Sequence, residues 1–181
     1  MRVPLIARVP GAAAGHAVAE PVELFDLMAT VLKLAGIEPA HPHWARSLVP
    51  QLQGTPGDPE RTVYAEGGAD PARRGTTYVR GPESIYHKGA EARREHPGIS
   101  SPTVMLRNAR HKLVYQRDDQ CELYDVLDDP RELVNLYGDP AHAAVRDALE
   151  RQLLHWYMDT STVASWEEDP RVTPTYDRNV T

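Results

Sequence analysis

Cysteine is almost absent from this chain of 181 residues, which contains a single one, Cys121. One cysteine excludes a disulfide within the chain and every metal site built from cysteines alone, and it leaves the redox compartment open. Long apolar runs are lacking too: no segment approaches the length that crosses a bilayer, and the first residues show no continuous apolar core of a signal peptide. We therefore expect no membrane partner and, by default, a cytoplasmic protein.

The chain also has no excess of basic over acidic residues. The chain carries 20 Lys and Arg against 26 Asp and Glu, interspersed along its length, for a net charge of -6. Nucleic-acid binding needs clustered basic side chains that displace counterions from phosphates, so we expect no nucleic-acid partner. The hydrophobic share of 41% suits one globular domain or two small ones, and the 16 prolines favour loops and short strands over a helical bundle.

A small antiparallel sheet is predicted in the second half of the chain. Residues 112–115 and 121–126 are rich in β-branched and aromatic side chains and flank a polar turn at 117–120. This pattern is typical of a β-hairpin. Residues 103–107 predict a strand that would extend the hairpin into an antiparallel sheet, and residues 61–66 predict a further strand.

Other segments of this half carry turn, loop or helix signals. Residues 76–80 are a further candidate strand, and the polar residues 82–100 predict a long surface loop. Asp139 and Pro140 suit the N-cap and the first position of a helix. The face of that helix expected to lie on the sheet comprises Val145, Ala148, Leu149, Gln152, Leu153 and Trp156. The tail at 159–181 is polar and rich in proline, and we expect it to be extended.

The residues after the hairpin end its second strand. Asp128, Asp129 and Pro130 cannot continue a strand, because proline lacks the ladder donor and aspartate favours turns. Residues 131–136 are expected to restart as a helical turn. That turn would fold three side chains back over the sheet, namely Leu133, Leu136 and Tyr137.

The N-terminal third predicts a different environment. Residues 3–10 form an apolar run that indicates a strand buried on both faces, which needs neighbouring strands. Pro21 suits the first turn of a helix, and apolar side chains then recur at helical spacing. Gly36 ends this helix at a position that favours a left-handed cap.

Four blocks of this sequence resemble the sulfatase family. Leu-Tyr-Asp at 123–125, Asp-Pro at 129–130, Glu132 and Asn-Leu at 135–136 resemble the family's C-terminal signature. The match concerns residue types and spacing over a dozen positions. These are residues that hold a corner of the fold, and none of them performs chemistry.

The other three blocks lie near the N-terminus. Arg-Val-Pro-Leu-Ile at 2–6, Asp-Leu-Met-Ala-Thr-Val-Leu-Lys-Leu-Ala-Gly-Ile at 26–37, and Ser-Leu-Val-Pro-Gln-Leu-Gln-Gly at 47–54 are similar to consecutive sulfatase segments. The resemblance therefore spans roughly the first three quarters of the chain.

The resemblance implies an α/β, alkaline-phosphatase-like fold, of which this chain would hold the C-terminal part. We expect one buried strand and helix of the large sheet, plus a small antiparallel sheet packed by a C-terminal helix. The expected domains are the truncated end of the catalytic α/β domain at 1–56, the antiparallel-sheet subdomain with its helix at 57–158, and the tail at 159–181.

The catalytic groups that the resemblance implies are missing from the sequence. Sulfatases use a calcium or magnesium ion and a formylglycine, made from Cys or Ser in a Cys/Ser-x-Pro/Ser-x-Arg motif. Cys121 precedes Glu-Leu-Tyr-Asp and Ser47 precedes Leu-Val-Pro-Gln, so neither fits. The family's metal-binding Asp-Asn or Asp-His pair and its sulfate-contacting lysine lie upstream of the segment that resembles residues 2–6. We expect no catalytic residue, metal ligand or cofactor in this chain.

The sequence thus predicts the C-terminal part of a sulfuric ester hydrolase, inactive alone. It would be a gene fragment, one half of a split hydrolase whose partner is the missing N-terminal half, or the product of a mis-called start at Met1. The intact enzyme would act on sulfate esters, with phosphonate or phosphate monoesters as alternative substrates. A different class remains open, a non-catalytic interaction module.

Substrate-rim candidates come from the polar loops. Tyr86, His87 and Lys88 offer a proton donor and a cation that suit a sulfate ester. Glu66 ends a predicted strand, and Arg74, with its neighbour Arg73, is an anion-binding candidate. Each has a plainer interpretation as a solvated surface residue. The same holds for His41 and His43 as metal ligands.

Overall fold

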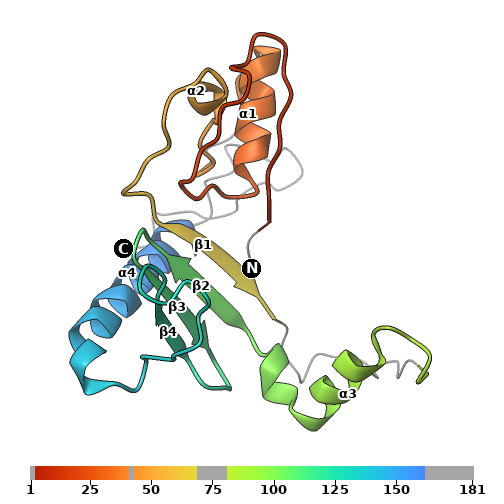
Figure 1. Ribbon diagram of the computed structural model, residues 1–181, viewed down its shortest axis with the longest axis vertical. Coiled ribbons are helices and arrows are strands. Elements are labelled where there is room, and N and C mark those ends of the chain that lie inside the picture. The colour runs from red at the N-terminus through yellow and green to blue at the C-terminus, as the bar shows by residue number, and fades with distance from the viewer. Residues whose placement is uncertain (1–2, 41–42, 69–80, 162–181) are drawn as a thin grey trace, which may run out of the picture.

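The computed structural model describes residues 3–40, 43–68 and 81–161. The strands and helices follow one another in this order: α1 (Asp26–Ala35), α2 (Val49–Leu52), β1 (Val63–Gly67), α3 (His87–Glu95), the 3-10 turn η2 (Pro97–Ser100), β2 (Thr103–Arg107), β3 (His111–Gln116), β4 (Glu122–Asp125), the 3-10 turn η3 (Pro140–His142) and α4 (Ala143–Ser161). Figure 1 shows α1 and α2 in a lobe above the sheet, called here the N-terminal lobe (residues 3–40 and 43–58), and α3 beyond the end of the sheet where β1 ends. None of the described helices is long and apolar enough to span a bilayer.

The four strands form an antiparallel sheet whose spatial order, β1-β2-β3-β4, is also the chain order. Leu106, Leu113 and Leu123 lie opposite one another on adjacent strands and are fully buried. They point to one face because side chains alternate along a strand. Leu149 and Leu153 of α4 complete this core, as the predicted helix face required.

α4 is also attached at both of its ends. Just before its start, Asp139 accepts a hydrogen bond from the Ala141 N–H at 2.9 Å, so the predicted N-cap residue caps the 3-10 turn η3 that leads into α4. Near its end, the Trp156 ring stacks on Tyr64 of β1, with centroids 4.5 Å apart. The helix therefore covers one face of the sheet from β4 to β1 (Figure 1).

The outer edge of β4 is closed by the segment that carries the Asn-Leu pair of the signature. Asn135 Oδ1 accepts from the Leu123 N–H at 3.1 Å and from the Tyr137 N–H at 3.0 Å, and Nδ2 donates to the Cys121 carbonyl at 3.1 Å. The Leu136 N–H donates to the Leu123 carbonyl at 2.8 Å. Asn135 thus acts as a substitute for a fifth strand, and it protects an edge that would otherwise pair with other chains.

Three predictions of local structure were wrong. Residues 3–10 form no strand, and Val3 and Ile6 are 75% and 92% exposed. A strand buried on both faces needs partners, and the sheet of the described residues is built from other segments. Residues 82–100 are not a loop, because they contain α3 and η2: the prolines flank the segment, while its Ala, Glu and Arg residues favour a helix.

The third error concerns the segment after the proline stop. Residues 131–136 are not helical, because Glu132 adopts a left-handed φ of 57° and Asp129 Oδ2 accepts from the Leu133 and Val134 N–H groups. Leu133 is exposed as a result. Leu136 and Tyr137 do pack against the core, as predicted.

The remaining boundaries differ less. The first helix begins at Asp26, later than Pro21 suggested, and ends at Gly36 with the predicted left-handed φ of 68°. The predicted strands at 61–66, 103–107, 112–115 and 121–126 are confirmed to within two residues. Residues 76–80 and 162–181 lie outside the described part of the chain.

We expect Asn135→Ala to lower the free energy of unfolding by about 2–3 kcal/mol, since each lost hydrogen bond costs about 1 kcal/mol. Asn135→Asp keeps the oxygen that accepts two bonds, but its second carboxylate oxygen replaces the donor to the Cys121 carbonyl and repels that oxygen. We expect its loss to be smaller because the two accepted bonds remain. Urea denaturation of the three proteins measures both values. Equal losses in the two variants would show that the edge closure does not depend on the accepted bonds.

Candidate functional site

A buried ion cluster joins the N-terminal lobe to the sheet. Arg61 Nη2 lies 2.7 Å from Asp26 Oδ2 and 2.9 Å from Glu23 Oε2. The side chains of Arg61, Asp26 and Glu23 are 4%, 0% and 11% exposed. Charges this deeply buried are tolerated only when they are paired and hydrogen-bonded, so the three groups must come together as the chain folds.

Backbone groups complete the cluster. Glu23 Oε1 accepts from the Tyr64 N–H at 2.9 Å, on the outer edge of β1. Asp26 accepts from the N–H of Arg46 at 2.8 Å and from that of Glu23 at 2.9 Å. Each carboxylate is therefore shared between Arg61 and the backbone, which fixes the lobe against the start of β1.

Thr30 extends the network along α1. Its Oγ1 donates to the Asp26 carbonyl at 2.7 Å and accepts from the Leu48 N–H at 2.8 Å. Sequence reasoning included Asp26 and Thr30 in a family-like block without giving them a role. The available signal was the spacing of two polar residues four apart within an apolar helix, which places them on one face.

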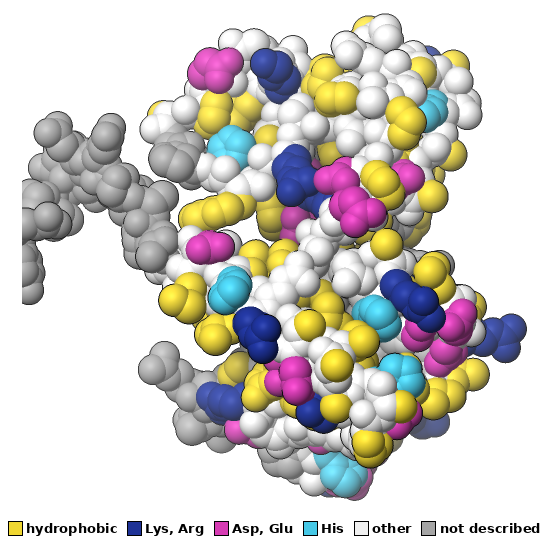
Figure 2. Space-filling model, turned by 90° about the vertical axis from the view of Figure 1, so that its left-hand side faces the viewer, with side chains coloured by type: hydrophobic (Ala, Val, Ile, Leu, Met, Phe, Trp, Pro, Cys, Tyr) yellow, Lys and Arg dark blue, Asp and Glu magenta, His cyan; other side chains and the backbone are white. Residues whose placement is uncertain are grey.

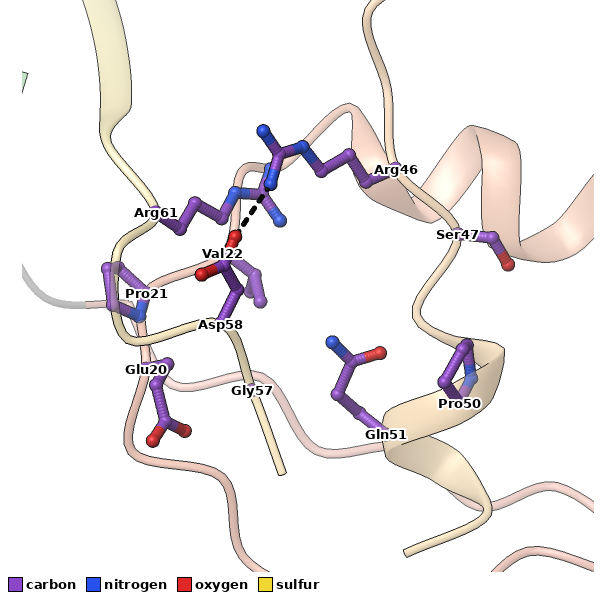
Figure 3. Close-up of a pocket in the computed structure, with 10 residues that line it drawn as sticks. All are labelled: Glu20, Pro21, Val22, Arg46, Ser47, Pro50, Gln51, Gly57, Asp58 and Arg61. Atoms are coloured by element: carbon purple, nitrogen blue, oxygen red, sulfur yellow. Dashed lines mark hydrogen bonds and ion pairs between the residues drawn. The ribbon is translucent and has the colours of Figure 1, made fainter. Parts of the chain in front are cut away.

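A hollow of about 140 Å³ opens beside Arg61 (Figure 3). It is lined by Glu20, Pro21, Val22, Arg46, Ser47, Pro50, Gln51, Gly57, Asp58 and Arg61. Arg46 Nη1 pairs with Asp58 Oδ2 at 3.0 Å, and Arg61 is held by the carboxylates described above. Both guanidinium groups of the lining are thus already neutralised, so the hollow has no excess positive charge that would attract a sulfate or phosphate group.

The predicted rim residues lie at the α3 end of the sheet (Figure 1). Tyr86 is the N-cap residue of α3 and His87 its first residue, with His87 Nε2 3.4 Å from Glu91 Oε1. Lys88 follows on the same helix and is exposed. Glu66 is an exposed residue of β1, opposite Val104 of β2, while Arg74 lies outside the described residues. Their role at a substrate rim stays a prediction.

Metal binding finds no support in the residues that the structure describes. Within residues 3–40, 43–68 and 81–161, no three His, Cys, Asp or Glu side chains form a group that could hold a metal ion. Calcium and magnesium require several oxygen ligands, so these residues do not fit the cation that the resemblance implies. Cys121 is a half-buried thiol whose Sγ lies 3.5 Å from the Gln116 carbonyl. His41 lies outside the described residues.

A second polar cluster lies at the corner after β4. Asp125 accepts from Arg110 Nε at 2.8 Å and from the Leu127 and Asp128 N–H groups at 3.2 Å each. Burial tends to raise the pKa of Asp125, but Arg110 and these N–H groups hold it below its ordinary value. This carboxylate is the Asp of the Leu-Tyr-Asp signature, and its contacts show that it shapes the corner.

His111 faces the same carboxylate, with Nε2 4.0 Å from Asp125 Oδ2. Burial lowers the pKa of His111; the negative charge of Asp125 opposes this effect, and the nearby Arg110 and His142 add to it. The imidazole therefore stays neutral at neutral pH. It packs at the start of β3 as a structural side chain.

Comparisons with known proteins find similarity to sulfatases and to phosphonate monoester hydrolases. Residues 82–159 match the family model described as N-sulphoglucosamine sulphohydrolase, C-terminal. The solved phosphonate monoester hydrolase of Silicibacter pomeroyi is similar to 84% of this chain and 28% of its own, with 32% identity and a TM-score of 0.62.

Two further solved structures are similar over less of the chain. A phosphonate monoester hydrolase of Agrobacterium radiobacter matches 74% of this chain and 24% of its own, with 26% identity and a TM-score of 0.52. A putative sulfatase of Bacteroides thetaiotaomicron matches 75% of this chain and 24% of its own, with 27% identity and a TM-score of 0.51. The chain spans about a quarter of the length of these solved relatives.

Arg61→Met should lower the free energy of unfolding by about 3–5 kcal/mol, because it leaves two buried carboxylates without their cation. Arg46→Met is the matched control: its partner Asp58 is 49% exposed, and exposed pairs contribute about 1 kcal/mol or less. Chemical denaturation of both variants at neutral pH measures the difference. Similar losses would mean that burial of the cluster does not determine its strength.

His111 should make the protein sensitive to mild acid. Because its pKa is lower in the folded protein, the unfolded chain binds the proton first as the pH falls through about 6.5. The contribution of neutral His111 to the free energy of unfolding is complete above that pH and is lost as the pH falls below it. The wild type should therefore lose more unfolding free energy than His111→Gln between pH 7.5 and pH 5.5, measured in urea. A larger loss in the variant would contradict this direction.

The fold now explains the sequence signature. The α/β arrangement, with its small four-stranded antiparallel sheet and C-terminal helix, is that of the alkaline-phosphatase-like sulfatases. Asp125 and Asn135 form the corner and edge at which the signature was found, and the family model covers this region. In sequence and in fold, the chain is therefore similar to the C-terminal portion of sulfatases.

Proposed function

We propose that this chain is the C-terminal part of a hydrolase of sulfuric esters or related monoesters, and that it supplies scaffold without the reacting groups. The observation that carries this proposal is the match of residues 82–159 to a sulfatase C-terminal family model. Support also comes from Cys121, which lacks the nucleophile motif. The divalent cation and the formylglycine of the family would belong to the rest of the hydrolase.

Exposed apolar side chains support a chain that needs a covering partner. Met28 and Val31 are exposed, and their spacing places them on one face of α1, while Leu24 is exposed in the turn just before the helix. Leu5 and Ile6 are exposed in the preceding segment, and Figure 2 shows hydrophobic side chains at the surface of the N-terminal lobe. An apolar helix face is normally buried, so the remaining α/β domain of the hydrolase is the covering partner we propose.

The substrate is proposed to be a sulfate ester or a phosphonate monoester. The family model and the Bacteroides thetaiotaomicron structure favour the sulfate ester. The Silicibacter pomeroyi structure, with 32% identity over 84% of this chain, favours the phosphonate monoester. In the intact hydrolase, Tyr86, His87 and Lys88 of the α3 segment would contribute to the rim of the substrate site, with Glu66 and Arg74.

The purified chain alone should not turn over p-nitrophenyl sulfate or a p-nitrophenyl phosphonate monoester, with or without added calcium or magnesium. Release of p-nitrophenol measures the activity, with the Silicibacter pomeroyi hydrolase as the positive control. Stoichiometric metal binding with turnover by this chain would overturn the proposal.

The apolar surface gives a second readout from the same protein. The chain should self-associate in size-exclusion chromatography, and Met28→Glu should reduce that association because it places a charge on the exposed face of α1. Gln53→Glu, at an exposed position after α2, is the control for a charge elsewhere in the lobe. A monomeric wild type would argue against a face that needs a covering domain.

A further inference from the structure

The hollow beside Arg61 contains two polar atoms whose hydrogen-bonding capacity is unused. Arg61 Nε and Gln51 Oε1 are both buried, and neither has a hydrogen-bond partner. Both residues line the hollow, and Figure 3 shows the Gln51 amide pointing from α2 toward its interior. Arg61 is 6% exposed, so water at the surface does not satisfy this donor. A buried donor and a buried acceptor without partners cost free energy unless a bound molecule satisfies them.

The charges of the lining define what that molecule can be. Arg46 is paired with Asp58, and Arg61 is paired with Glu23 and Asp26. Glu20 is the remaining charged residue of the lining, and Figure 3 shows its carboxylate directed away from Gln51. An anion would gain no unused cation here, and it would approach carboxylates. A metal cation would compete with two guanidinium groups for the same carboxylates. The lining therefore fits a neutral molecule that both accepts and donates hydrogen bonds.

We propose that the hollow is a binding site for a small neutral polyhydroxylated molecule, such as a triol or the edge of a sugar ring. One hydroxyl oxygen accepts from Arg61 Nε, and a hydroxyl O–H donates to Gln51 Oε1. Pro21, Val22 and Pro50 give an apolar side that contacts the carbon atoms of such a molecule. A volume of about 140 Å³ is more than a single water fills, since one water needs only about 10–15 Å³ of such space.

The walls of the hollow are held in place by local geometry. A Cβ atom at Gly57 would come within 2.6 Å of the Glu20 side chain and 2.9 Å of Val18 Cγ1, so only glycine lets these segments approach. The Arg61 cluster fixes the opposite wall. The site is thus formed before a ligand binds, which lowers the entropic cost of binding. This inference does not depend on the proposed hydrolase function.

The test is a titration of the 181-residue chain with glycerol and with methyl α-D-glucopyranoside, followed by ¹H–¹⁵N correlation spectra. We expect saturable shifts of the Gln51 side-chain amide and the Gly57 N–H. Gln51→Leu should weaken binding about fivefold or more, the effect of losing one hydrogen bond. Gln53→Leu, two residues away and exposed, should bind like the wild type. Gln51→Asn, whose shorter amide withdraws from the hollow, should repeat the loss if Gln51→Leu does not fold.

Three results would overturn the proposal. The first is a linear, non-saturable response to both polyols, which would leave ordered water as the occupant. The second is unchanged affinity in Gln51→Leu or Gln51→Asn. The third is a response at these resonances to sodium sulfate or calcium chloride in place of the polyols, which would identify an ion site.

Discussion

A single buried guanidinium connects the two parts of this molecule. Arg61 forms buried ion pairs with Glu23 and Asp26. These carboxylates also accept hydrogen bonds from the backbone N–H groups of Tyr64 and Arg46. Because an unpaired buried charge is far more costly than an unpaired exposed one, the lobe cannot separate from the start of β1 without a large loss. The position of the hollow relative to the sheet follows from this one contact.

The second organising feature is the corner after β4, where the family signature is located. Asp125 binds Arg110 and two backbone N–H groups, and Asn135 replaces a neighbouring strand along β4. Lys112 of β3 forms an ion pair with Glu132, which lies in the segment after β4. A signature made of such residues can persist without a catalytic role, because each side chain satisfies backbone groups that would otherwise be left unpaired.

Local patterns predicted the antiparallel sheet, the capped helix and its apolar face, because alternation, turn residues and the Asp-Pro cap are properties of neighbouring residues. Residues 3–10 were mispredicted, since a strand depends on partners that a local pattern does not specify. Residues 82–100 were predicted to be a loop because they hold four prolines or glycines, many charges and little apolar content, whereas their Ala, Glu and Arg residues favour the helix that forms. The Arg61 cluster was missed: its members lie 35 and 38 positions apart, and one sequence does not show which charges will meet.

The sheet described above is a meander, in which each strand pairs with the next along the chain. Only the step from β1 to β2 spans a long insertion, and the β2–β3–β4 portion joins neighbours through short turns. Low contact order of this kind speeds folding, because only short loops must close, at a small cost in chain entropy, before neighbouring strands can pair. The β2–β4 meander therefore rests on contacts between near neighbours in the chain, whereas the Arg61 cluster joins residues 35 and 38 positions apart.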